Sequence, residues 1–213
     1  LYLNEVDRML ERAKTVTRHG IYTAVEYARF ADDLVILVDA HPRHAWLLTA
    51  VEKRLREELA LLGVEVNEEK TRIVDLTTGA SFGFLGFDFR RVRSLKGAWR
   101  PQYTPKLNKR TALLRTLKAI FGRSRSQPVR ELIQQINPIL RGWVNDFAVG
   151  HAGRCFSFVR DWVEKKVRRH LMRNAKRGGF GWRRWRRAWL ANTLGLFDGY
   201  QVRDRGATVV PAR

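Results

Sequence analysis

Cysteine is nearly absent from this sequence, since its 213 residues include only Cys155. A single cysteine excludes an internal disulfide framework and a zinc site built from several thiolates. The simplest setting for such a chain is reducing, and we therefore expect a cytoplasmic protein. The five histidines show no metal-ligand spacing, and we expect ordinary surface or capping roles for them.

Long apolar runs are also missing. None approaches the roughly 20 residues that a membrane-spanning helix needs, and no secretory signal is visible, so we expect no membrane partner. The chain begins with Leu1 in a segment that already has a helical pattern. We expect it to be a fragment or a processed product.

Acidic residues become scarce after the first third of the chain. Residues 1–75 hold 11 Lys and Arg against 14 Asp and Glu, a net charge of −3, whereas residues 76–213 hold 30 against 7, a net charge of +23. A dense basic half favours nucleic acid as the partner, with an anionic membrane as the lesser alternative. Seven Trp, several within the basic run, strengthen this interpretation because aromatic and Arg planes stack on unpaired bases.

Apolar spacing predicts a mixed α/β unit in the first half. Residues 1–19 and 42–62 have helical periodicity, and residues 25–30 and 34–38 are the strands of a predicted hairpin. The second strand, "LVILV", is continuously apolar, which is typical of a strand buried on both faces. Residues 64–76 predict a strand, a polar turn and a second strand.

The segment "SFGFLGFDFRR" is predicted as another strand pair or a bent strand. Its aromatics change phase between Phe84 and Phe87, which a bulge or bend near Gly86 would reconcile. From about residue 100 the pattern is helical, with candidate helices over 107–121, 128–149 and 154–175. The fold class is therefore α+β, a mixed-sheet unit over 1–100 followed by an all-α bundle over 101–213.

Asp32 and Asp33 lie side by side at the tip of the predicted hairpin. Asp is a favoured turn residue, so a lone pair in a hairpin is most often structural. Adjacent carboxylates also repel, and a divalent cation removes that penalty. Hard oxygen ligands favour Mg²⁺ or Mn²⁺, the ions of two-metal phosphoryl and nucleotidyl transfer. The pair alone leaves both interpretations open.

Four ordered elements resemble the group II intron reverse transcriptase/maturase family. "RFADDLVILV" resembles the catalytic hairpin of reverse transcriptases, with Phe30 where Tyr is usual, and "GVEVNEEKTRIVDL" resembles the element that follows it. "FGFLGFDF" resembles the hairpin that grips the primer. "INPILRGWVNDFAVG" and the basic helix after it resemble the thumb, or maturase-specific domain, and "LGLFDGYQV" is also typical of it.

The resemblance implies an RNA-directed DNA polymerase with the C-terminal part of a palm over 1–100 and a thumb over 101–213. Asp32 and Asp33 would be catalytic and would bind Mg²⁺, with Mn²⁺ as a substitute. Lys70 would neutralise or protonate the departing pyrophosphate. Substrate contacts would come from Phe30, Asn67, Phe84, Leu85 and Gly86, the glycine allowing a primer backbone to approach closely.

The partners implied by the resemblance are a structured intron RNA and an RNA template with its DNA primer, in a bacterial cytoplasm. The segment from Arg160 to Leu190 carries 12 Lys and Arg against Asp161 and Glu164. Trp182, Trp185 and Trp189 are spaced as on one helical face, which would anchor this segment to the bundle. Trp143 and Trp162 are expected in the core. The candidate nucleic-acid contacts are Arg141, Asn145, Arg168, Arg169, Arg173, Lys176, Arg177, Arg183, Arg184, Arg186 and Arg187.

The family also implies a third metal-binding Asp on an earlier strand and an N-terminal fingers subdomain. Asp7 lies in a predicted helix and does not match that Asp, so we expect the isolated chain to be inactive as a polymerase. Two alternatives stay open. The protein could be a non-catalytic RNA-binding splicing factor that keeps the polymerase fold, or a DNA-binding module that uses its basic helices.

Overall fold

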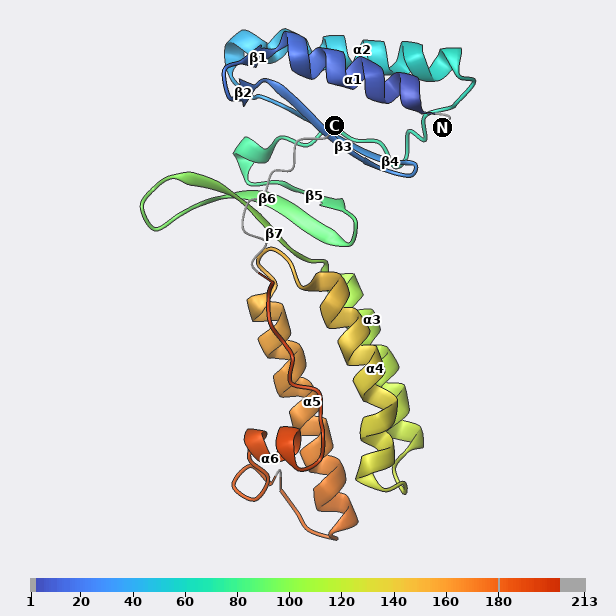
Figure 1. Ribbon diagram of the computed structural model, residues 1–213, viewed down its shortest axis with the longest axis vertical. Coiled ribbons are helices and arrows are strands. Elements are labelled where there is room, and N and C mark those ends of the chain that lie inside the picture. Colours follow the sequence, from blue (N-terminus) through green and yellow to red (C-terminus); the bar gives the residue numbers. More distant parts are fainter. Residues whose placement is uncertain (1–2, 180, 204–213) are drawn as a thin grey trace. The chain divides into compact units, whose positions relative to one another are not determined.

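The computed structural model describes residues 3–179 and 181–203, and the chain divides into two compact units, Leu1–Ala80 and Ser81–Arg213 (Figure 1). Helices and small sheets are both present, in agreement with the predicted combination of helix and sheet. Among the described residues every strand pairing is antiparallel, so the expected mixed sheet is not found there. No described helix is long and apolar enough to cross a membrane.

Two helices cover a two-stranded sheet in the first unit (Figure 1). Their shared core includes Val6, Leu10, Val25, Leu47 and Val51, all buried. The apolar residues recur at helical spacing because they lie on the helix faces that pack into this core. The elements are α1 (Asn4–Val16), β1 (Arg18–His19), β2 (Tyr22–Thr23), β3 (Val25–Phe30), β4 (Asp33–Val38), the 3₁₀ turn η1 (Pro42–His44), α2 (Ala45–Leu61) and the 3₁₀ turn η2 (Leu76–Thr78).

Strand β4 is not buried on both faces, contrary to the prediction. Leu34, Ile36 and Val38 pack against the core of the unit, but Leu37 is 46% exposed. The cause is that β3 and β4 form a sheet of two strands, and the helices contact only one of its faces. A continuous apolar run thus does not establish burial by itself.

The two strands predicted within residues 64–76 are absent. The described chain is irregular there, with a turn at Asn67 and the short η2 at its end. Gly63, at φ +66°, ends α2 as its position predicts. Local β-propensity was insufficient because no neighbouring strand pairs with this segment.

The second unit begins with a three-stranded sheet in the order β5 (Ser81–Phe84), β6 (Phe87–Arg93) and β7 (Trp99–Pro105). Leu85 and Gly86 form a two-residue turn with φ values of +48° and +82°, the pattern of a type I′ hairpin. This turn, rather than a bulge, explains the change of phase. Phe82 faces Phe89 and Phe84 faces Phe87 across the hairpin, so all four rings lie on one side of the sheet.

Strand β7 is a strand that the sequence did not indicate. Pro101 and Pro105 lie in it, and proline argues against an ordinary strand. The structure accommodates both because β7 is the edge strand and pairs only with β6.

Three long helices form the bundle that the periodicity predicted. They are α3 (Leu107–Arg123), α4 (Val129–Phe147) and α5 (Gly153–Asn174), followed by the short α6 (Arg187–Asn192). Leu117, Ile136 and Val163 lie in their common core. Trp143 and Trp162 pack against it, as expected. His170 is not a surface residue, because it is 2% exposed with Nε2 3.0 Å from the carbonyl oxygen of Gln127.

The sheet over 81–105 belongs to the same compact unit as the helices, whereas the sequence placed the division near residue 100. The reason is aromatic packing. Phe87 contacts Phe147 with ring centroids 5.2 Å apart, and Phe87, Phe147 and Phe156 share one buried cluster. The backbone N–H of His151 also donates to the carbonyl of Tyr103 on β7 at 2.9 Å.

Candidate functional site

The aspartate pair lies at the tip of the β3–β4 hairpin, as predicted. Phe30 pairs with Asp33, so Ala31 and Asp32 form a two-residue turn. Both carboxylates are exposed, and the Phe30 side chain is 63% exposed. Ala31 has φ +54°, the positive value at the first central position that a type II′ turn requires. Glycine is usual there, so the turn holds a strained alanine immediately before the acids.

An arginine holds this turn from β3. The Nη1 of Arg29 donates to the carbonyl of Ala31 at 3.0 Å, and its Nε donates to Oδ1 of Asp7 at 2.8 Å. A second bond joins the Nη2 of Arg29 to Oδ2 of Asp7. The hydrogen bonds from Arg29 lower the pKa of Asp7. Asp7, on α1, is therefore engaged with a structural partner on β3.

The chemistry of the pair suits a hard divalent cation, since Asp32 and Asp33 present only carboxylate oxygens. A divalent site usually takes further oxygen ligands from protein, water or substrate. Within the part of the chain that the structure describes, no group of three or more His, Cys, Asp or Glu residues is placed to hold a metal. The pair can thus supply two ligands of such a site.

Asn67 and Lys70 lie together on the turn after α2. The Oδ1 of Asn67 accepts the backbone N–H of Lys70 at 3.1 Å, and the carbonyl of Asn67 accepts the same N–H. The Asn67 side chain thus caps the backbone three residues on, which gives it a structural role in this turn. The Lys70 side chain is exposed and able to meet a ligand.

Residues 84–86 form the tip of the β5–β6 hairpin, with Phe84 half-buried and Leu85 47% exposed. A Cβ added to Gly86 would lie 3.2 Å from the ring of Phe147. The carbonyl of Gly86 accepts the backbone N–H of Lys106 at 2.9 Å. The close approach that Gly86 allows in this structure is therefore to the protein's own helix α4.

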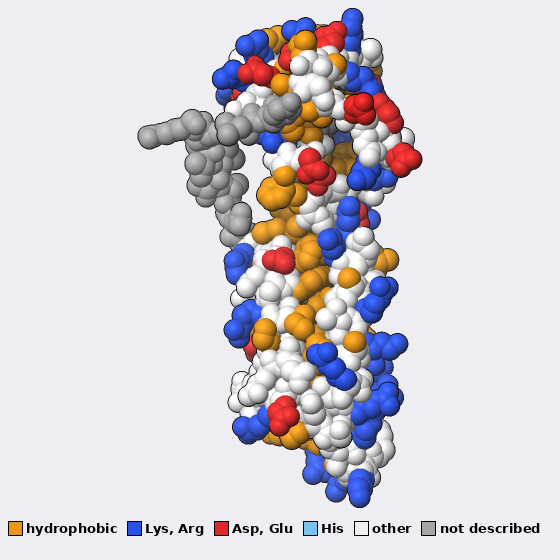
Figure 2. Space-filling model, turned by 90° about the vertical axis from the view of Figure 1, so that its right-hand side faces the viewer, with side chains coloured by type: hydrophobic (Ala, Val, Ile, Leu, Met, Phe, Trp, Pro, Cys, Tyr) orange, Lys and Arg blue, Asp and Glu red, His pale blue; other side chains and the backbone are white. Residues whose placement is uncertain are grey.

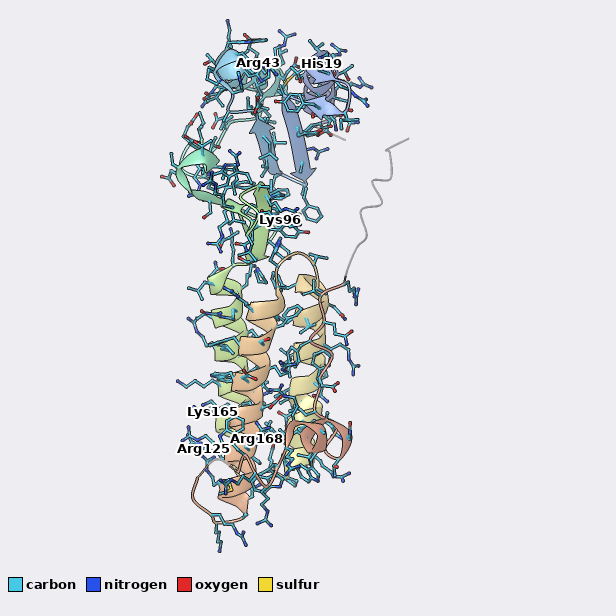
Figure 3. All side chains as sticks on the ribbon, turned by 90° about the vertical axis from the view of Figure 1, so that its left-hand side faces the viewer. His19, Arg43, Lys96, Arg125, Lys165 and Arg168 are labelled. Carbon is cyan, nitrogen blue, oxygen red and sulfur yellow. The ribbon has the colours of Figure 1, made fainter. Side chains whose placement is uncertain are left out.

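The predicted nucleic-acid contacts are exposed with one exception. Figure 2 shows many Lys and Arg and few acidic side chains over the helices of the second unit. Asn145 also accepts a hydrogen bond from Arg203 at 2.8 Å. The exposed predicted residues are Arg141, Asn145, Arg169, Arg173, Lys176, Arg177, Arg183, Arg184, Arg186 and Arg187. The exception is Arg168, which is 2% exposed among the helices (Figure 3).

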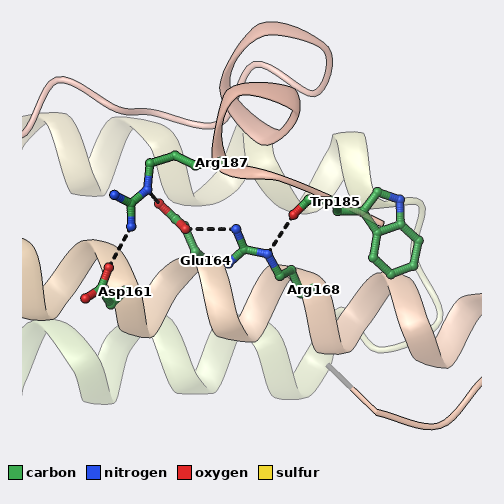
Figure 4. Close-up of polar contacts among 5 residues, drawn as sticks. All are labelled: Asp161, Glu164, Arg168, Trp185 and Arg187. Atoms are coloured by element: carbon green, nitrogen blue, oxygen red, sulfur yellow. Dashed lines mark hydrogen bonds and ion pairs between the residues drawn. The ribbon is translucent and has the colours of Figure 1, made fainter. Parts of the chain in front are cut away.

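Arg168 belongs to a buried ion-pair network (Figure 4). Its Nη2 donates to Oε2 of Glu164 at 3.0 Å, and its Nε donates to the carbonyl of Trp185 at 2.8 Å. Arg187 donates from Nε to Oε1 of Glu164 at 2.6 Å and from Nη2 to Asp161 at 2.8 Å. The network ties the segment 181–187 to α5, so Arg168 supports the basic surface from beneath and presents no phosphate-binding group to solvent.

The three tryptophans of the basic segment do not share a helical face, because helix α6 begins only at Arg187. Trp185 is 8% exposed and, with Trp189, packs on the bundle core, which confirms their anchoring role. Trp182 is 50% exposed, and the guanidinium carbon of Arg168 lies 4.2 Å from its ring centroid. The helix that the Trp spacing alone suggested does not form over 182–186, where the chain turns and Arg186 is extended.

Two structural ion pairs near the candidate sites escaped sequence reasoning. Arg29 and Asp7 are 22 positions apart, and no local signal links them. Glu164 and Arg168 have the i, i+4 spacing of a helical ion pair, which was a usable signal. Its burial, however, depends on the covering segment that contains Trp185.

Comparison with known protein families finds a match for the helical part of the second unit. Residues 110–189 match the family model described as the group II intron, maturase-specific domain. The match begins within α3 and ends within α6, so it covers the helical bundle and most of the basic segment. No curated protein matches the chain. The matched domain supports a group II intron maturase-type protein, implies a role in the splicing or mobility of such introns, and suggests binding to their RNA.

Proposed function

We propose that this chain is the C-terminal palm and thumb of a group II intron reverse transcriptase/maturase, and that its helical unit binds structured intron RNA. The observation that carries the proposal is the coincidence of the maturase-specific match with the basic bundle. Cations there are exposed and supported from beneath by the Glu164–Arg168 network. Such a surface binds RNA phosphates and releases counterions.

Salt-dependent binding tests the RNA-binding role. The full chain is titrated against a group II intron transcript between roughly 50 and 200 mM salt, a range in which proteins with several phosphate contacts lose much of their affinity. Replacing Arg173, Arg177 and Arg183 by Gln should weaken binding and reduce the logarithmic salt slope by about 2 to 3. The matched control replaces Arg12, Arg43 and Lys53 of the first unit and should leave the slope unchanged. A flat salt response in the unmodified chain would contradict the proposal.

The first unit would supply part of a polymerase site. Asp32 and Asp33 would hold Mg²⁺, or Mn²⁺ as a substitute, and the ion would stabilise charge during nucleotidyl transfer. Support comes from paired oxygen donors on an exposed turn that Arg29 holds in place. Phe30, beside the pair, would pack near a nucleotide. Lys70 would contribute positive charge toward the departing pyrophosphate.

Primer extension separates this role from the alternative of a non-catalytic splicing factor. Asp32→Ala with Asp33→Ala is introduced into a polypeptide that also carries the fingers and the remaining palm. DNA synthesis should be lost and splicing retained. Surviving synthesis would contradict the metal role, and a joint loss of splicing would indicate a structural role. An unmodified polypeptide that splices without synthesising DNA would favour the splicing factor.

A further inference from the structure

The β6–β7 hairpin carries a second concentration of positive charge, outside the matched domain. Residues 90–100, "RRVRSLKGAWR", include five Lys and Arg and no Asp or Glu. The strands pair through Arg91 with Pro101, Val92 with Arg100, and Arg93 with Trp99. These basic residues therefore lie on a hydrogen-bonded, two-stranded ribbon, residues 90–100.

This ribbon extends beyond the part of the sheet that packs on the helices. Phe87, Phe89 and Tyr103 occupy its bundle end and join the buried aromatic cluster. In Figure 1 the loop end of the β6–β7 hairpin extends sideways from the helices of its unit. Lys96 lies at that end, and Leu95 beside it is fully exposed (Figure 3). The far half of the ribbon is thus open to a ligand.

An exposed tryptophan lies among the ribbon's cations. Trp99 is 48% exposed, with the guanidinium carbons of Arg91 and Arg93 lying 4.6 and 5.5 Å from its ring centroid. These contacts restrict the indole without burying it. No carboxylate in the described part of the chain forms an ion pair with the ribbon's five Lys and Arg. The positive charge is consequently not neutralised by the protein itself.

We propose that the ribbon over 90–100 is a separate binding site for single-stranded RNA, with an unpaired base stacked on Trp99 and phosphates contacted by Arg90, Lys96 and Arg100. The chemistry is that of single-strand binding proteins, in which aromatic side chains stack bases and a basic groove follows the backbone. Arg91 and Arg93 orient the indole and supply further positive charge. This site deepens the proposed RNA-binding function and rests on it.

Binding of the full chain to an oligouridylate and to a group II intron transcript tests the site. Trp99→Ala should weaken oligouridylate binding between about 5-fold and about 150-fold, and Trp99→Phe should restore most of it. Replacing Arg90, Lys96 and Arg100 by Gln should reduce the salt slope by about 2. The triple variant of Arg12, Arg43 and Lys53 serves as the charge-matched control. A 4-thiouridine probe should crosslink to the peptide over 97–100.

The outcomes distinguish this site from the bundle surface. Unchanged binding in both ribbon variants, together with weakened binding in the Arg173, Arg177 and Arg183 variant, would overturn the ribbon and preserve the proposed function. Unchanged binding in all variants would overturn both. Equal affinity for oligothymidylate would show that the site does not discriminate RNA from DNA and would contradict its assignment to RNA. A far-ultraviolet circular dichroism melt confirms that each variant is folded.

Discussion

The guanidinium of Arg29 bonds at once to the carboxylate of Asp7 on α1 and to the carbonyl of Ala31 in the β3–β4 turn. The side chains of Arg29 and Asp7 are 25% and 27% exposed. A helix residue thus stabilises the strained turn that carries Asp32 and Asp33, although it does not contact the pair itself.

Replacing Arg29 by Gln should loosen this turn. The variant loses the bidentate contact to Asp7 and the bond to Ala31, and we expect a destabilisation of about 1–2 kcal/mol for a partly buried charged network. Amide hydrogen exchange should accelerate over residues 25–38. Arg12→Gln, on the exposed face of α1, is the control. Equal protection in the two variants would show that Arg29 does not hold the hairpin.

Acid should weaken the same contact. Because hydrogen bonds from Arg29 lower the pKa of Asp7 below its ordinary value of 3.8, the carboxylate contributes stability above that value and loses it as pH falls through the lower folded-state pKa. Hydrogen-exchange protection of β3 should therefore fall below about pH 4. Asp7→Asn should be less stable at neutral pH and lose less on acidification. Glu26 and Asp39, whose pKa values are also lowered, remain in both proteins as an internal reference.

Gly86→Ala should destabilise the second unit by about 1–2 kcal/mol, since a side chain would be forced to positive φ. The new Cβ would also press on Phe147. Gly122→Ala is a control of opposite sign, because that glycine lies in α3 with open space around its Cα and alanine favours a helix. The midpoint of thermal unfolding measures both. An unchanged midpoint for Gly86→Ala would mean that the β5–β6 turn yields easily.

Arg168→Ala should destabilise the second unit by about 3 kcal/mol, because the variant leaves the buried Glu164 with one partner fewer. The segment 181–187 should also become sensitive to limited proteolysis, since its anchor at the carbonyl of Trp185 is lost. Arg173→Ala, exposed on the same helix, should change stability by less than about 0.5 kcal/mol. If the two variants unfold alike, the network is not a structural anchor.

The sequence by itself determined the elements whose signals are local. Apolar periodicity predicted α1, α2 and the three long helices, and turn chemistry placed Asp32 at a hairpin tip. The order of motifs indicated the maturase-type helical region that the family match supports. The uneven charge distribution indicated that the second half of the chain is basic. The residues that form each helix or turn lie close together in the chain, so their pattern can be recognised in the sequence.

Only the tertiary structure decided which of those residues are buried, paired or free. Arg168 and Arg169 are neighbours in a basic run, yet Arg168 is buried because the Trp185 segment folds over it and Arg169 is exposed. Strand β7, with two prolines, forms because β6 offers it an edge, and the apolar β4 stays half-exposed because the helices cover only one face of its sheet. The physical reason is common to these cases. Burial and pairing depend on partners distant in the chain, which local propensity does not specify.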